Sequence, residues 1–425
     1  MFPFCGRLPE ISCVLIVGTL LAVSAEAQHR VPLTLAEAED LAVADEPGAA
    51  AIRARADAYQ EQAVAAGQLP DPVLRVGVAN YPIESGGFST EGMTQAQLGI
   101  RQAFPRGKSR ALMTEQLRSM STEKRGQAEA RSRDVLMAAR QSWLETYYWQ
   151  SAEQIMSESR PFFADLVTIT RSMYSVGRKT QHDVLRAELE LSRLDDRLIV
   201  AQRQRAEGQA ALSQWIGDEA YRPVASKLPA WDELPSLQAL RSRLAAHPLL
   251  AAADAGIEAR QSAVDLANES YKPGWALDFG YGYREGSLAS GEPRSDFVSL
   301  SVSVDLPFFG ENRQDRELSA ALHERRAARK SKAALLARLD SDLGTEYARW
   351  SELTRRLSLY EQQILEQSAG QAKAALLAYQ SDAGDFSDVM RGYIDDLDTR
   401  LEHIRLKVER TRSYAEIANL GGIPR

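Results

Sequence analysis

Two stretches of this chain repeat one pattern: Tyr174-Ser-Val-Gly-Arg-Lys-Thr-Gln-His-Asp-Val-Leu-Arg186 and Tyr379-Gln-Ser-Asp-Ala-Gly-Asp-Phe-Ser-Asp-Val-Met-Arg391. In both stretches a glycine follows the tyrosine, and an Asp-Val-Leu/Met-Arg run begins nine residues after it. Upstream, Pro72 corresponds in the same way to Pro273. Self-similarity over such a distance indicates two copies of one structural unit rather than two domains of different chemistry.

Each copy contains two short segments in which apolar and polar residues alternate. The expected strands cover residues 73–81 and 95–104 in the first copy, and 276–283 and 297–306 in the second. The last of these reads Phe-Val-Ser-Leu-Ser-Val-Ser-Val-Asp-Leu, which matches the length and period of a strand that crosses an outer membrane. The apolar positions expected to face lipid include Leu277, Phe279, Val298, Leu300, Val302 and Val304.

Four strands cannot close a barrel, because roughly eight are the smallest useful number. Open strand edges would be costly in lipid, so these strands require several chains. Three copies would supply twelve strands, although the sequence alone does not fix that number. An ordinary half-buried hairpin on a soluble sheet is the alternative for either strand pair taken alone.

Long helices follow each strand pair. The expected ranges are 108–174 and 181–215 in the first copy, and 312–379 and 386–418 in the second. A helix of some 67 residues is about 100 Å long at ~1.5 Å per residue. Its apolar residues recur every three to four positions and form narrow seams, a pattern typical of coiled-coil packing. Pro161 is expected to kink the first long helix or to end it early.

The repeated stretch itself is expected to be the turn between two long helices. Gly177 and Gly384 would let the chain reverse at a helix C-terminus. Thr180 or Ser387, a few residues further on, could cap the returning helix.

Residues 1–27 have the pattern of a secretory signal peptide. An apolar run from Ile11 to Val23 precedes Ala25-Glu26-Ala27, an A-x-A cleavage site. An uncleaved N-terminal anchor is the alternative. The mature chain divides into a first repeat, 28–222, a proline-rich linker, 223–236, and a second repeat, 237–425. It keeps no cysteine and has no apolar run near 20 residues, so we expect neither a disulfide nor a transmembrane helix.

Several kinds of chemistry are not indicated. The net charge is −7 without a basic stripe, so we expect no nucleic-acid partner. Gly107-Lys108-Ser109 ends like a P-loop, but Gln102 stands where the earlier glycine is required, so a strand-to-helix turn is expected. The histidines never pair at ligand spacing, and there is no Gly-x-Ser-x-Gly motif. We therefore expect no enzyme, cofactor or metal site, and His182 is expected to be a solvated turn residue.

The duplicated plan of strand pair, long helix, turn and returning helix resembles the TolC outer-membrane efflux family over essentially the whole mature chain. Gln68-Leu-Pro-Asp-Pro-Val-Leu74 and Gln102-Ala-Phe-Pro-Arg-Gly-Lys108 are similar to its heavy-metal-efflux branch, which is CzcC- or CusC-like. The resemblance implies a mostly helical α+β fold. It also implies a homotrimer whose twelve-stranded outer-membrane β-barrel continues into a periplasmic α-barrel. The implied partners are outer-membrane lipid, a periplasmic adaptor (membrane fusion) protein and an inner-membrane RND transporter.

The resemblance further implies that the helical turns form a closable periplasmic entrance. Its carboxylates would be Asp183 and Asp388, although a second acidic position of the family is Arg391 here. In the family the first-copy aspartate links to a tyrosine and an arginine of the second-copy turn. Asp183 and Tyr379 fit this pattern, and Tyr174 is the first-copy equivalent of Tyr379. Gly384 occupies the arginine position, so Arg178 or Lys179 could substitute.

The resemblance favours an exit duct for heavy-metal cations or other small toxic solutes, driven by an RND pump. The alternatives are the outer-membrane component of a drug-efflux or type I protein-secretion system, and a non-conducting coiled-coil envelope scaffold. An envelope hydrolase would need a nucleophile, for which the mature sequence offers no candidate.

Overall fold

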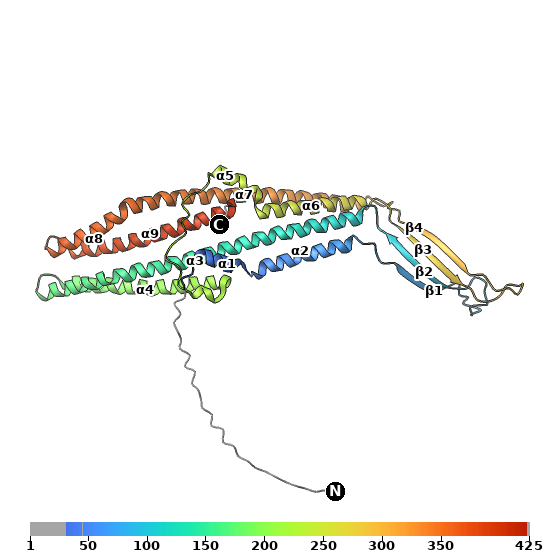
Figure 1. The fold of residues 1–425 in the computed structure, drawn as a ribbon, viewed down its shortest axis with the longest axis horizontal. Helices are drawn as coiled ribbons and strands as arrows, with labels where there is room; N and C mark the ends of the chain where they lie inside the picture. The colour runs from blue at the N-terminus through green and yellow to red at the C-terminus, as the bar shows by residue number, and fades with distance from the viewer. Residues whose placement is uncertain (1–30, 45, 423–425) are drawn as a thin grey trace, which may run out of the picture.

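The computed structural model describes residues 31–44 and 46–422. The chain forms a long rod with a sheet at one end and two helical turns at the other (Figure 1). The expected signal peptide, residues 1–27, lies outside the described residues.

Helices make up most of the rod. The longer helices are α2 (Pro47–Ala66), α3 (Ser109–Ser175), α4 (Gln181–Ile216), α6 (Pro248–Glu269), α7 (Gln314–Leu359), α8 (Leu365–Gln380) and α9 (Phe386–Gly421). The shorter helical segments are α1 (Leu35–Ala44), η1 (Gly217–Tyr221), α5 (Leu237–Arg243) and η2 (Leu244–Ala246). Helix α3 contacts α2, α4, α6 and α9, so it is the spine of the rod. Within the described residues, no helix combines the length and apolar character needed to cross a membrane.

Two long helices differ in detail from what the sequence suggests. Helix α3 neither ends early nor breaks at Pro161, which lies inside it. The range 312–379 contains α7 and α8, joined by η3 (Tyr360–Ile364), a single π-helical turn. A π turn inserts a residue into the α-helical ladder and rotates the side chains that follow it.

The sheet contains β1 (Val73–Ala79), β2 (Gln95–Phe104), β3 (Trp275–Tyr283) and β4 (Phe297–Val304), all antiparallel and in this order. The two repeats meet where β2 pairs with β3. Strand β1 ends two residues before position 81, because Asn80 adopts a positive φ of 53°. Strand β4 ends two residues before position 306, because its partner β3 begins at Trp275, opposite Val304. Strands β1 and β4 are the two outer strands of this sheet.

The segment between the repeats, 223–236, packs on the rod. Val224 forms a parallel bridge with Leu33. Trp231 stacks on Tyr414 of α9, with 5.1 Å between ring centroids. The Arg140 guanidinium of α3 lies 5.3 Å from the Trp231 ring centroid. These contacts fasten the segment across the middle of the rod.

The core consists of narrow seams between helices. One seam surrounds Trp143 and Leu144, and a second runs towards the helical turns and includes Leu194 and Tyr379. At Gly208, a Cβ atom would approach Thr146 Oγ1 to 2.7 Å, so α3 and α4 can pack this closely only with glycine there. The predicted fold class, mostly helical α+β with a duplicated unit, is confirmed.

Candidate functional site: the helical tips and the exposed sheet

The first tip is the turn between α3 and α4. Gly177 takes a left-handed φ of 74° and reverses the chain. Thr180 caps α4 and forms a capping box with Asp183, whose Oδ2 accepts hydrogen bonds from the Thr180 amide and hydroxyl at 3.2 and 3.1 Å. Asp183 therefore fixes the start of α4. His182 is exposed, and no group of His, Cys, Asp or Glu able to hold a metal occurs among the described residues.

The second tip, between α8 and α9, is built differently. The left-handed residue is Asp382, with φ of 59°, and not Gly384. Gly384 is needed for a close approach instead, because a Cβ atom there would lie 3.0 Å from the Ala378 Cβ. Asp385, rather than Ser387, precedes the first turn of α9, and its side chain makes no capping bond.

Lys179 joins the two tips within one protomer. Its Nζ lies 3.3 Å from Asp382 Oδ1 and 4.5 Å from the centroid of the Tyr379 ring. The Lys179 side chain is 17% exposed, so much of it is shielded from water. Arg178 and Lys179 are the two residues that the sequence offered in place of the family's arginine. Lys179 makes this contact with the second tip, whereas Arg178 is exposed.

Tyr379 is the buried centre of this contact. Its side chain is fully buried and packs against Phe386, with 5.5 Å between ring centroids. Burial raises the pKa of the Tyr379 phenol to about 12, and the nearby Asp183 and Asp382 carboxylates act in the same direction. Within the described part of the chain its hydroxyl has no hydrogen-bond partner, so no bond joins it to Asp183 in the single protomer. Tyr174, its counterpart, is half exposed.

Two further tip contacts involve the repeated Asp-Val-Leu/Met-Arg runs. Arg391 Nη1 lies 3.7 Å from Asp388 Oδ1, and both side chains are exposed. Arg186 of α4 donates a 2.7 Å hydrogen bond to Ser387 Oγ of α9. Sequence analysis missed the Arg186 contact, although this arginine ends the repeated run that marked the turn.

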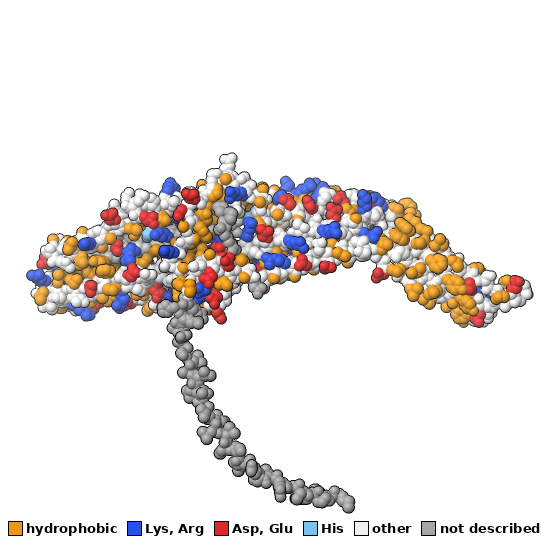
Figure 2. All heavy atoms as spheres, in the orientation of Figure 1, with side chains coloured by type: hydrophobic (Ala, Val, Ile, Leu, Met, Phe, Trp, Pro, Cys, Tyr) orange, Lys and Arg blue, Asp and Glu red, His pale blue; other side chains and the backbone are white. Residues whose placement is uncertain are grey.

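One face of the sheet is apolar and open to solvent. In the register, Leu74, Ile100, Phe279 and Leu300 form one continuous row across the four strands. All of the expected lipid-facing side chains are exposed, from 37% for Leu277 to 69% for Leu300. Figure 2 shows hydrophobic side chains gathered over this end of the molecule. An exposed apolar face of this extent needs a lipid or protein cover.

Aromatic side chains lie at both ends of the apolar face. Phe104 and Trp275 stack at the helical end, with 4.0 Å between ring centroids, and Tyr283 lies at the opposite end of β3. The eight-residue step from Trp275 to Tyr283 covers about 27 Å along the strand at ~3.4 Å per residue, which is about 21 Å along the membrane normal at a tilt of ~40° and comparable to the ~25 Å apolar band of an outer-membrane barrel. Aromatic residues favour the membrane–water interface, so this spacing suits an outer membrane.

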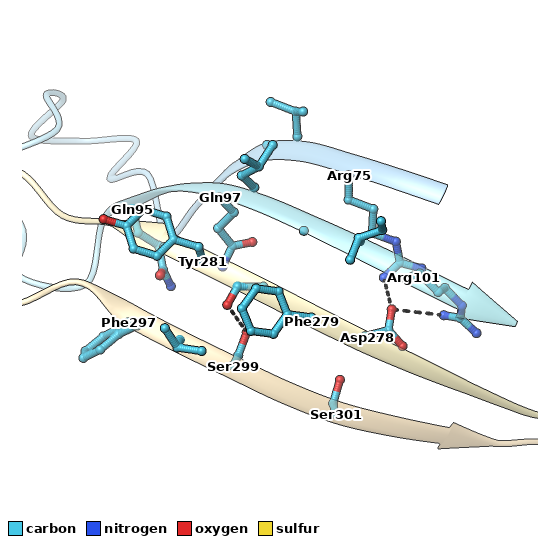
Figure 3. A pocket seen from close by; sticks show the side chains of 18 of the residues that line it. Arg75, Gln95, Gln97, Arg101, Asp278, Phe279, Tyr281, Phe297, Ser299 and Ser301 are labelled. Carbon is cyan, nitrogen blue, oxygen red and sulfur yellow. Dashed lines mark hydrogen bonds and ion pairs between the residues drawn. The ribbon is translucent and has the colours of Figure 1, made fainter. Parts of the chain in front are cut away.

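The opposite face of the sheet is polar. Arg75, Arg101 and Asp278 form a charged cluster on three adjacent strands, accompanied by glutamine and serine side chains (Figure 3). At the far end of the sheet, the 284–296 loop holds the 80–94 loop. Arg284 Nη1 donates to the Gly92 carbonyl at 3.0 Å, and Arg294 Nη1 donates to the Glu91 carbonyl at 3.1 Å.

Known proteins share this architecture. Residues 239–422 match the model of the family described as outer membrane efflux protein. The fold is similar to that of crystal structures of CusC, with a TM-score of 0.78, 14% identity and coverage of 92% of both chains. It is also similar to the outer membrane protein VceC of Vibrio cholerae, with a TM-score of 0.75, 17% identity and coverage of 91% and 96%.

A curated relative is also found among sequences. Protein CyaE of Bordetella pertussis is 28% identical over 264 residues, which are 59% of this chain and 54% of CyaE. The chain therefore spans about half the length of this relative.

The rod of helices and the amphipathic sheet define a protein of the outer membrane with a large periplasmic part. The second repeat matches the outer membrane efflux protein family, and the fold of the described chain is similar to that of solved outer-membrane proteins, in line with the resemblance that the duplicated sequence suggested. The crystal structures of CusC describe a protein that forms a transmembrane channel.

Proposed function

We propose that three copies of this chain form the exit duct of a tripartite efflux system. The observation that carries the proposal is the sheet. Its apolar face is exposed, and the outer edges of strands β1 and β4 pair with no other strand among the described residues. Pairing β4 of one copy with β1 of the next would satisfy both edges and close a barrel. The apolar face would then contact lipid, and the polar face would line the pore.

In this proposal the helices continue the duct through the periplasm, and the tips form its gate. Partners of two kinds are required, because the chain has no energy source of its own. A periplasmic adaptor would grip the helices, and an inner-membrane transporter, of RND type by family resemblance, would supply the cargo. The cargo we propose is heavy-metal cations or other small toxic solutes, on the basis of the CusC-like segments and the similarity to the CusC fold.

Planar-bilayer recording of the detergent-purified protein tests the duct. We expect small single-channel currents from the wild type and larger ones from Asp183→Ala/Asp388→Ala, because removal of the capping box loosens the first tip. A protein that inserts but never conducts, even with its tip altered, would favour the scaffold reading instead.

A further inference from the structure

Three charged side chains form a compact cluster on the polar face of the sheet. Arg75 lies on β1, Arg101 on β2 and Asp278 on β3, and Arg101 is paired directly with Asp278 in the register. Arg75 Nη1 lies 3.1 Å from Asp278 Oδ1, and Arg101 Nη1 lies 3.8 Å from the same oxygen (Figure 3). The cluster combines both repeats, because β2 and β3 meet at their junction.

The cluster carries more positive charge than its carboxylate can neutralise. Two guanidinium groups share one oxygen of Asp278, so each copy has a net charge of +1 at this level. Other polar side chains that line this hollow are uncharged: Gln95, Gln97, Ser299, Ser301 and Ser303. The two arginines therefore set the sign of the charge along the middle of this face.

The excess charge is available to a solute. The Arg75 side chain is 57% exposed and the Arg101 side chain 33%, whereas Asp278 is only 17% exposed. A guanidinium presents five N–H donors in a planar fork, and the single shared oxygen occupies few of them. The donors that remain suit carboxylate and phosphate oxygens, which arginine binds in a bidentate manner.

We propose that Arg75, Arg101 and Asp278 form an anion-preferring belt inside the pore. This inference rests on the proposed duct, because only closure of the sheet places the polar face inside. Three copies would carry six arginines and three aspartates, with a net charge of +3. The belt concentrates small solutes that bear carboxylate or phosphate groups and disfavours bare metal cations, so a metal passes it best as an anionic complex.

Screening limits the reach of the belt. The Debye length is about 10 Å at 0.1 M salt and about 3 Å at 1 M, so the field extends into the lumen only at low ionic strength. A lumen lined by one sign of charge raises the local concentration of counter-ions. The anion preference should therefore be clear at 0.1 M salt and weak at 1 M, unlike discrimination by size.

The test is the reversal potential of single channels in a KCl gradient around 0.1 M. The background is Lys179→Ala, which removes the ion pair between the two tips. We expect Arg75→Gln/Arg101→Gln to lower the chloride-to-potassium permeability ratio by about twofold or more, and Asp278→Asn to raise it. Gln97→Ala, on the same face but uncharged, should leave the ratio unchanged. If the double variant fails to form trimers, Arg75→Gln alone serves, because it leaves the Arg101–Asp278 pair in place.

The outcomes separate the belt from the duct. Conducting channels whose permeability ratio is the same in all the variants would overturn the belt and leave the duct standing. Absence of conductance in every variant, together with the Lys179→Ala parent, would overturn the duct and the belt with it.

Discussion

Lys179 of the first tip places its ammonium group 3.3 Å from the Asp382 carboxylate of the second tip. The same ammonium lies over the face of the buried Tyr379 ring. One cation from the first repeat thus holds the two tips of a protomer together through an ion pair and a cation–π contact. If these tips form the gate of the proposed duct, we expect the Lys179 contact to favour the closed state.

Replacing Lys179 with alanine should open the gate. The ion pair and the cation–π contact together contribute about 1–2 kcal/mol, which corresponds to a ~5–30-fold rise in the open population. Single-channel recording should show larger or more frequent openings. Arg178→Ala is the matched control, since that neighbouring side chain is exposed, and equal openings in both variants would refute the assignment.

Tyr379 should act through its ring and not through its hydroxyl. Tyr379→Phe removes a buried hydroxyl without a hydrogen-bond partner in the described chain, so the free energy of unfolding should stay constant or rise by about 1 kcal/mol. Tyr379→Ala should destabilise by about 3–5 kcal/mol and open the gate, because it removes a buried aromatic ring. Thermal unfolding and conductance of both variants check this, and a Phe variant that opens would indicate a hydroxyl bond to a carboxylate.

The buried ion pair of Arg140 and Glu39 should contribute strongly to the stability of the rod. Arg140 Nε lies 2.6 Å from Glu39 Oε1, and both side chains are only 5% exposed. Glu39→Gln should lower the free energy of unfolding by about 3–5 kcal/mol, because it leaves a buried guanidinium charge without its counter-ion.

The exposed pair of Arg160 and Asp195 provides the control for that substitution. Its side chains are 47% and 40% exposed, so Asp195→Asn should cost below about 1 kcal/mol. Denaturant unfolding in detergent measures both variants, and similar losses would show that the Arg140–Glu39 pair has no special role.

His403 should make the middle of the rod sensitive to acid. Burial lowers the pKa of His403 below its ordinary 6.5, and nearby Lys407 acts in the same direction, although the hydrogen bond to Glu361 of the π turn opposes both. Below pH 6.5 the unfolded chain therefore binds the proton more readily than the folded chain, and stability falls as the pH falls.

The variant His403→Gln isolates this contribution. Its thermal midpoint should fall less than that of the wild type between pH 7 and pH 5. Equal falls in both proteins would assign the acid sensitivity to other groups.

The sequence predicted much of the fold because local patterns dictate it. The alternation of apolar and polar residues over 95–104 corresponds to β2, and the repeated turn separates the long helices at both tips. Position in the turn also marked Arg178 and Lys179 as possible replacements for the family's arginine, and Lys179 is the one that contacts the second tip. In each case a short-range pattern carries the information.

Features that depend on contacts between repeats were not predictable. The charged cluster exists only because β2 pairs with β3, which brings Arg101 opposite Asp278. Trp231 looked like a linker residue because its partner, Tyr414, is far away in the sequence. The π turn at Tyr360–Ile364 contains neither glycine nor proline, so the sequence gives no signal that the α-helix is interrupted there.

The account depends most on closure of the sheet between copies, which disulfide trapping measures directly. The only cysteines, Cys5 and Cys13, lie in the expected signal peptide. Cysteines introduced in pairs would therefore have no native cysteine to react with in the mature chain. Val76→Cys on β1 would be combined in turn with cysteine at each apolar position of β4, at 298, 300, 302 and 304. At least one of these pairs should give covalent dimers and trimers after oxidation, with nothing larger. In the control, Leu98→Cys on the inner strand β2 replaces Val76→Cys and is combined with the same β4 cysteines, and it should give no cross-linked product. A ladder that extends beyond trimers, or no cross-link at any β4 position, would contradict a duct made of three copies.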